Sequence, residues 1–322
     1  PLMGGGDWND GMNKVGIKGS GTSVWLGFFL YYIISDFIEI VKKHKKLDTK
    51  KYISFLDKLK YSLNTVAWDG DYYLRAFFDN GSTLGSHLND ECKIDLICQS
   101  FSILSDVITK DKINSVIKSV EENLVDSDLK IIKLLTPPFS KSINNPGYIM
   151  DYPEGIRENG GQYTHATIWY IMALIKLGAN ELAYNYYQMI NPINRTLTKN
   201  DVKRYKVEPY VIAADIYSNK QNPGRGGWTW YTGSSAWFYN IGITQILGLR
   251  KEGNTLKFSP SVPDNWDCYE IEYKYFDTLY KIKVNFTDNN DIVLDGDKLT
   301  KDFITLKNDK RIHAIVVNIR RN

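Results

Sequence analysis

The hydrophobic pattern changes its period near residue 251, and this change constrains the fold more than any other feature of the chain. Before it, apolar residues recur at helical spacing, as in SVWLGFFLYYIISDFIEIVKKHKK at 23–46. After it, stretches such as CYEIEYKYFDTLYKIKVNF alternate apolar and polar residues between Asn, Asp and Gly turns. The first pattern is typical of amphipathic helices and the second of half-buried strands. The sequence therefore predicts a helical domain at 1–251 and a small antiparallel β-sandwich domain at 252–322.

The loops between the predicted helices are rich in Gly, Trp, Glu and Arg. Sequential, paired helices with such residues in alternate loops fit an α/α toroid with a site at one rim, because a rigid scaffold places functional loops. The apolar run at 24–34 is too short to span a bilayer, so a buried helix is expected there. Helices are predicted at 23–46, 48–68, 89–106, 110–124, 162–177, 179–189, 200–217 and 233–247.

Composition narrows the class of partner. Lys and Arg number 40 and Asp and Glu 37, so no charge excess points to nucleic acid or an anionic membrane. Three cysteines without CxxC spacing disfavour a disulfide framework and a zinc site, and they favour a reducing, cytoplasmic location. The 22 Tyr, 13 Phe and 8 Trp beside many acids indicate a carbohydrate site, since aromatic faces stack on sugar rings.

The stretch GGGDWNDGMN at 4–13 is the first that carries chemistry. It predicts a loop with helix-like turns in which Asp7 and Asp10 flank Trp8. One acid can serve as a general acid while Trp8 stacks on a sugar ring. The alternative is an Asp helix cap beside a packed Trp.

The stretch NDECKIDLICQS at 89–100 places three acids at a helix start. Acids there interact favourably with the helix dipole, so capping is preferred to substrate binding for Asp90, Glu91 and Asp95. Gln99 fits either role.

Two further stretches place polar groups at the start of a helix. In RENGGQYTH at 157–165, Glu158 and His165 flank a Gly-Gly turn that directs backbone N–H groups and an imidazole toward one space. In GRGGWTWYTGSSAW, the Thr232 hydroxyl and the Gly233 amide form a candidate cradle for phosphate or carboxylate. The alternatives are a structural histidine and a Thr-type helix cap.

Together these groups meet the needs of a phosphorolytic enzyme that acts on a glycoside. An inverting hydrolase uses one carboxyl group as acid and a second as the base that activates water. Inorganic phosphate is already a nucleophile at neutral pH, so one acid and a phosphate cradle suffice. The residues thus indicate cleavage of a glycosidic bond by phosphate.

Several blocks resemble the family-94 inverting glycoside phosphorylases, which include cellobiose, cellodextrin and chitobiose phosphorylases. They are GGGDWNDGMNKVG, GSHLNDECKIDLICQS, PGYIMDYPEGIRENGGQYTHATIW, RYKVEPYVIAADIYS and GRGGWTWYTGSSAWFY. Within that family they are most similar to 1,2-β-oligoglucan phosphorylases and to the phosphorylase-like domain of cyclic β-1,2-glucan synthases. The resemblance covers about residues 1–265. It implies a mainly α fold, part of an (α/α)6 barrel, followed by a C-terminal β domain.

The resemblance also implies roles for single residues. The family's catalytic acid falls on Asp10, and Trp8 lines the subsite of the transferred sugar. The phosphate-binding His falls on His165, and the Thr-Gly pair on Thr232 and Gly233. No metal or organic cofactor is expected, because the anion site and one acid supply the charge stabilisation and the proton transfer, and phosphate is a substrate. Sugar contacts are expected from Trp8, Asp7, Glu158 and Gln99.

The activity implied is phosphorolysis of a β-1,2-linked oligoglucan to α-glucose 1-phosphate, with the reverse synthesis. The alternatives are the chain-length-controlling domain of a cyclic β-1,2-glucan synthase, a cellobiose-type β-1,4 phosphorylase, a hydrolase and a non-catalytic carbohydrate-binding protein. Family members carry further barrel helices and a sandwich upstream. The chain is therefore expected to be the C-terminal part of a larger enzyme. It is expected to need the upstream part of that enzyme as a partner. A homodimer is a further option, and membrane contact is expected only for the synthase.

Overall fold

The computed structural model describes residues 1–44 and 48–321. The chain divides into two compact units, which are described separately. A helical unit comprises Pro1–Leu177 and Tyr186–Trp237, and a β unit comprises Gly178–Asn185 and Phe238–Asn322. The helices are α1 (Val24–Lys43), α2 (Lys50–Thr65), α3 (Leu96–Leu104), α4 (Lys110–Asn123), α5 (Thr164–Lys176), α6 (Asn180–Ile190), α7 (Lys199–Tyr205) and α8 (Ser234–Ile241).

The helices α3 and α7 are at most half as long as predicted. The helix expected at 89–106 begins only at Leu96, because Asp95 caps it. The helix expected at 200–217 ends at Tyr205, where Lys206 adopts a left-handed φ of 59°. Pro209 follows closely, and a proline both lacks an N–H donor and disfavours helical backbone before it.

Three core helices each begin directly after a two-residue strand. β1 (Thr22–Ser23) leads into α1, β4 (Ile94–Asp95) into α3, and β8 (Gln162–Tyr163) into α5. These strands pair with β2 (Ala76–Phe77), β7 (Leu135–Thr136) and β9 (Asp215–Ile216), and β2 also pairs with β3 (Thr83–Leu84). α1 packs on α3, and α3 packs on α5. The strand pairs therefore fix the loops at the N-terminal ends of neighbouring helices. The remaining short pair in this unit joins β5 (Val125–Asp126) and β6 (Ile131–Ile132).

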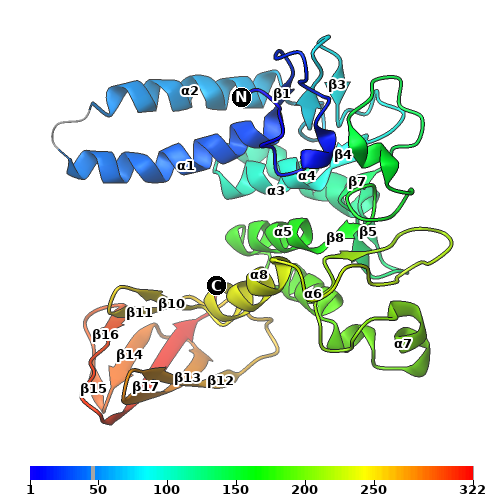
Figure 1. Cartoon of the computed structure of the whole chain (residues 1–322). Helices are drawn as coiled ribbons and strands as arrows, with labels where there is room; N and C mark the ends of the chain where they lie inside the picture. The colour runs from blue at the N-terminus through cyan, green and yellow to red at the C-terminus, as the bar shows by residue number, and fades with distance from the viewer. Residues whose placement is uncertain (45–47, 322) are drawn as a thin grey trace. The chain divides into compact units, whose positions relative to one another are not determined.

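α1 differs from the buried helix expected at its position. Trp25 and Phe28 near its start are buried, whereas Ile33, Phe37 and Ile40 are 41–55% exposed. α1 and α2 run side by side, and their far ends extend beyond α3 (Figure 1). The helix has 20 residues, and an 18-residue window within it has a mean hydropathy of 1.7. Its length and composition are those of a membrane span, but core helices of other proteins can have the same length and composition. The helix predicted at 23–46 is thus observed at Val24–Lys43, whereas the burial expected for the run at 24–34 holds only at the start of the helix.

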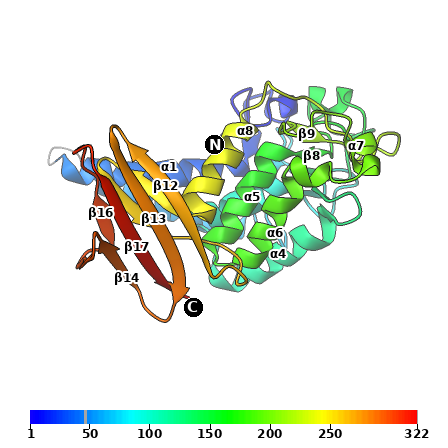
Figure 2. The same cartoon turned by 90° about the horizontal axis from the view of Figure 1, so that it is seen from below.

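The β unit has two sheets around one core. One sheet has the order β10 (Leu249–Glu252), β11 (Thr255–Phe258) and β16 (Phe303–Thr305). The other has the order β12 (Cys268–Tyr275), β13 (Thr278–Thr287), β17 (Ile312–Arg320), β14 (Asp291–Leu294) and β15 (Asp297–Lys298) (Figure 2). Leu256 of the first sheet and Val284 and Val317 of the second belong to the same apolar cluster.

The prediction of a purely antiparallel β domain was wrong in one pair. β13 and β17 are parallel, with Ile282 opposite Ile315. Alternation with a period of two residues is the same for either strand direction, so the sequence pattern cannot distinguish them. Cys92, Cys98 and Cys268 are free thiols.

Candidate active site

The DWND stretch forms a turn that ends in the 3₁₀ helix η1 (Asp10–Met12), in agreement with the loop expected there. The backbone is anchored, because Met3 and Met12 are buried in one apolar core. Asp10 is exposed. Desolvation and a hydrogen bond to Asp10 raise the pKa of the Tyr148 hydroxyl. The loop therefore presents one carboxyl group to solvent from a fixed position.

Asp7 instead points into the protein and pairs with Arg75. The Arg75 guanidinium contacts both carboxylate oxygens of Asp7, and its Nε lies 3.4 Å from Asp95 Oδ2. Ser23 donates to Asp7 Oδ2 at 2.6 Å and caps α1 by accepting from Leu26 N–H. The three charged side chains are at most 1% exposed. Asp7 thus holds the loop in place, which corrects the expectation that it contacts sugar.

Gln99 is also structural. Its side-chain oxygen accepts from Tyr73 N–H at 2.9 Å, and its nitrogen donates to the carbonyls of Tyr73 and Asp95. Because these bonds occupy the buried amide, Gln99 has no group directed at a sugar, unlike the contact expected from the resemblance. Asp95 caps α3 as predicted. Glu91 does not, since it accepts hydrogen bonds from residues 141–142 of another loop.

Asp95→Asn is expected to change how stability depends on pH. Burial raises the pKa of Asp95 to about 6, although Arg75 lowers it. The pKa of Asp95 in the unfolded chain is about 4. Between about pH 4 and about pH 6 the folded chain therefore binds more protons at Asp95 than the unfolded chain does, and its stability falls as pH rises through 6. Asn keeps the cap without titrating. Relative to the wild type, the variant should gain about 2–3 kcal/mol in free energy of unfolding between about pH 4 and about pH 8. Urea unfolding at both pH values measures this, and a pH-independent difference would contradict it.

Glu158 lies in a tight loop beside Arg157, which adopts a left-handed φ of 52°. Arg157 Nε is 3.5 Å from Glu158 Oε2, and its guanidinium lies 5.0 Å from the Tyr152 ring and 4.9 Å from the Trp228 ring. Burial raises the pKa of Glu158. Within the described part of the chain, Glu158 Oε2 is buried without a hydrogen-bond partner. The ion pair with Arg157 leaves this oxygen without a hydrogen bond, so it is suited to accept one from a ligand hydroxyl.

His165, in the first turn of α5, lies among tryptophans. Its ring centroid is 4.3 Å from that of Trp169, 5.7 Å from that of Trp8 and 5.6 Å from that of Trp237. Burial lowers the pKa of His165 to about 4, so the imidazole is neutral at pH 7. Among the described residues, its buried Nε2 has no hydrogen-bond partner. This nitrogen is therefore available to a ligand.

Thr232 and Gly233 form the turn that begins α8. Thr232 Oγ1 accepts from Ser234 N–H at 3.1 Å and lies 2.5 Å from Ser234 Oγ. This is the Thr-type turn that was the alternative to a phosphate cradle. Gly233 is exposed, and a Cβ added to it would meet no atom within 4 Å. The main chain at this helix start is therefore open to a ligand.

The three predicted stretches converge on one aromatic cluster. Its rings include those of Trp8, Trp25, Phe29, Phe101, Tyr163, His165, Trp169 and Trp237. Trp8 brings the DWND loop to the cluster, His165 brings the start of α5, and Trp237 brings the first turn of α8. Asp7 and Gln99 lie outside it, in the layer that supports the loop.

The sequence motifs did not identify Arg75, Tyr148 and Arg157 as residues of the site. Arg75 sits in an ordinary loop sequence and gives no local signal. Tyr148 belongs to η2 (Tyr148–Asp151). Arg157 directly precedes Glu158 in the sequence, and this adjacency was the signal that could have identified it.

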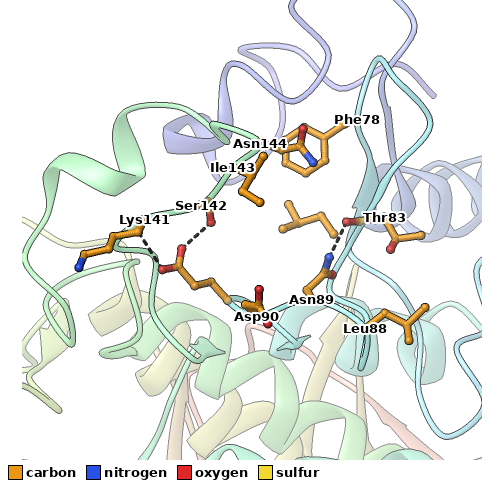
Figure 3. Close-up of a pocket in the computed structure, with 11 residues that line it drawn as sticks. Phe78, Thr83, Leu88, Asn89, Asp90, Lys141, Ser142, Ile143 and Asn144 are labelled. Carbon is orange, nitrogen blue, oxygen red and sulfur yellow. Dashed lines mark hydrogen bonds between the residues drawn. The ribbon is translucent and has the colours of Figure 1, made fainter.

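A separate cavity of about 320 Å³ lies between the β2–β3 segment and residues 141–144 (Figure 3). Its acid Glu91 already accepts hydrogen bonds from Lys141 N–H and Ser142 Oγ, and the Asn89 amide donates to the Thr83 carbonyl. None of the predicted sugar or phosphate residues is among the described residues that line it. The cavity is therefore distinct from the candidate active site.

Three helix starts thus bring Trp8 and Trp237 against His165, whose buried Nε2 has no hydrogen-bond partner in the described part of the chain. The chain belongs to the glycosyl hydrolase 94 superfamily, because the model of that superfamily's catalytic domain matches residues 1–248. The resemblance drawn from the sequence blocks is thereby confirmed.

Individual relatives are phosphorylases and a glucan synthase. The chain is 45% identical over 286 residues to the cyclic β-(1,2)-glucan synthase NdvB of Rhizobium meliloti, a match that covers 88% of this chain and 10% of the synthase. It is 25% identical over 323 residues to solabiose phosphorylase of Paenibacillus borealis, covering 98% and 41%. It is 24% identical over 318 residues to 1,2-β-oligoglucan phosphorylase of Listeria innocua, covering 92% and 29%. The chain thus spans less than half the length of each of these relatives.

Proposed function

We propose that the chain carries the phosphorolytic site of an inverting β-glucoside phosphorylase. The substrate proposed is a β-1,2-linked oligoglucan, and the products are α-glucose 1-phosphate and a shortened glucan. Membership of the superfamily and the likeness to a 1,2-β-oligoglucan phosphorylase support this reading. The observation that carries it is the convergence of three stretches on His165, whose buried Nε2 has no partner in the described part of the chain.

In the proposed reaction, Asp10 donates a proton to the glycosidic oxygen as the bond from that oxygen to C1 breaks. A phosphate oxygen forms the new bond to C1 from the opposite face, and the proton carried by phosphate restores Asp10. Trp8 stacks on the sugar, and Glu158 Oε2 accepts from one of its hydroxyls. His165 and the Thr232–Gly233 turn hold phosphate. A neutral imidazole can donate to a phosphate oxygen from Nε2, so the low pKa is compatible with this role.

The helices are further proposed to be part of an (α/α)6 barrel with its site at one rim. The superfamily match supports this, and so does the placement of three loops at neighbouring helix starts. Such a barrel has more helices than the described part of this chain, and the exposed apolar side chains of α1 are suited to pack on further ones.

A second candidate function is control of chain length within a cyclic β-1,2-glucan synthase. The 45% identity to NdvB favours it. The same site would then shorten or extend the linear glucan before it is cyclised. The discriminating measurement is whether the full polypeptide also forms cyclic glucan, because phosphate-dependent shortening alone fits both candidate functions.

His165→Ala is expected to raise KM for phosphate about tenfold or more, because it removes one hydrogen bond to the anion. The protein is the longest polypeptide that the gene encodes. Phosphorolysis of a panel of β-linked disaccharides gives the KM for phosphate, and phosphate release from α-glucose 1-phosphate follows the reverse synthesis. His87→Ala is the matched control, since His87 is 60% exposed and pairs with Asp69. An unchanged KM for phosphate would remove His165 from the anion site.

A further inference from the structure

One surface beside the candidate site exposes aromatic rings that the proposed reaction does not use. Trp228, Trp230, Tyr231 and Tyr210 are 48–82% exposed. Large aromatic side chains are usually well buried, and a cluster of exposed ones marks a binding surface. We refer to these four residues as the aromatic platform.

The platform is held in a strained, ordered arrangement. Trp230 adopts a left-handed φ of 64°, which is costly for a bulky residue. Tyr231 N–H donates to the Thr229 carbonyl at 2.7 Å, closing a tight three-residue turn around Trp230. The indole Nε1 of Trp230 donates to Glu208 Oε1 at 2.7 Å, and its ring contacts Tyr210 edge-on at 6.2 Å. The fold therefore fixes an exposed indole instead of leaving it free.

The platform is continuous with the candidate active site through Asp215. Asp215 Oδ1 accepts from Trp228 N–H at 3.2 Å, and Oδ2 accepts from Arg157 N–H at 3.0 Å. Gly227 permits this approach, since a Cβ there would lie 2.2 Å from Asp215 Oδ1. The Trp228 ring also contacts the guanidinium of Arg157, which pairs with Glu158. A ligand bound at Glu158 can therefore extend onto Trp228 and the rings beyond it.

We propose that the aromatic platform binds sugar units of a neutral β-linked glucan that lie beyond the bond being cleaved. This rests on the proposed function for the identity of the glucan. The faces of Trp230 and Trp228 offer stacking surfaces for pyranose rings. Glu208, beside Trp230, offers an acceptor for sugar hydroxyls. The platform thus favours longer substrates over disaccharides.

The test compares Trp230→Ala, Trp230→Phe and the control Tyr61→Ala, since Tyr61 is a 72% exposed aromatic residue on α2. Binding of β-1,2-linked glucose oligomers of two and of five units is measured by calorimetry, with Asp10→Asn as the common background to prevent turnover. Trp230→Ala should weaken binding of the longer oligomer about tenfold, or about 1.4 kcal/mol, and leave the disaccharide unchanged. The affinity of Trp230→Phe for the longer oligomer should lie between those of Trp230→Ala and the background, and the affinity of Tyr61→Ala should equal that of the background.

Two results would overturn the platform. One is equal binding of the long oligomer by Trp230→Ala and its background. The other is an equal loss for both oligomers, which would mean that Trp230 only supports the Thr232 turn. Because binding is read without catalysis, a protein that binds through Trp230 but never releases phosphate would sustain the platform while refuting the proposed phosphorolysis.

Discussion

Arg75→Met is expected to lower the free energy of unfolding by about 3–5 kcal/mol, because it leaves two buried carboxylates without a counter-charge. Arg75, Asp7 and Asp95 are at most 1% exposed. Asp7 would also lose its link to the DWND loop, so activity should fall even where the chain stays folded. Urea unfolding with circular dichroism near pH 7 measures the loss.

The control for this prediction combines Arg75→Met with Asp7→Asn and Asp95→Asn. That variant leaves no unpaired charge, since replacing all members of a buried ionic group is often tolerated. It should recover most of the lost stability. A loss below about 1 kcal/mol for Arg75→Met alone, the range of an exposed pair, would show that the group does not hold the loop.

Asp10→Asn is expected to lower kcat for phosphorolysis by about 10²–10⁴-fold, the usual contribution of a general acid. Asp10 is exposed, so the free energy of unfolding should change by less than about 0.5 kcal/mol. Steady-state kinetics with phosphate and a β-1,2-linked oligomer measure the effect. Asp151→Asn is the matched control, as Asp151 is an exposed acid in the adjacent η2. A similar loss of kcat in both variants, or no loss in Asp10→Asn, would show that another residue is the general acid.

Local sequence signals predicted most of the architecture. The change of period located the transition from helices to strands. Helical spacing predicted α1, α2, α4, α5 and α6 at ranges close to the observed ones, although burial follows the period in α1 only near its start. The direction of β17 was not predictable, since partner and direction of a strand depend on residues far away in the sequence.

The candidate site shows the same limit. Trp8, His165 and Thr232 each stand at a turn or helix start, where Gly-rich loops mark them. The roles of Asp7 and Gln99 could not be predicted, because their partners Arg75 and Tyr73 lie 68 and 26 residues away. Whether an acid faces solvent or a buried guanidinium depends on packing that no short motif encodes.

The most direct test of the phosphorolytic reading is the phosphate dependence of glucan cleavage. The protein is incubated with β-1,2-linked glucose oligomers with and without inorganic phosphate, and the anomeric signals are followed by proton NMR. The proposed function predicts α-glucose 1-phosphate in the presence of phosphate and no cleavage in its absence. Release of free reducing sugar at the same rate without phosphate would contradict it and indicate a hydrolase.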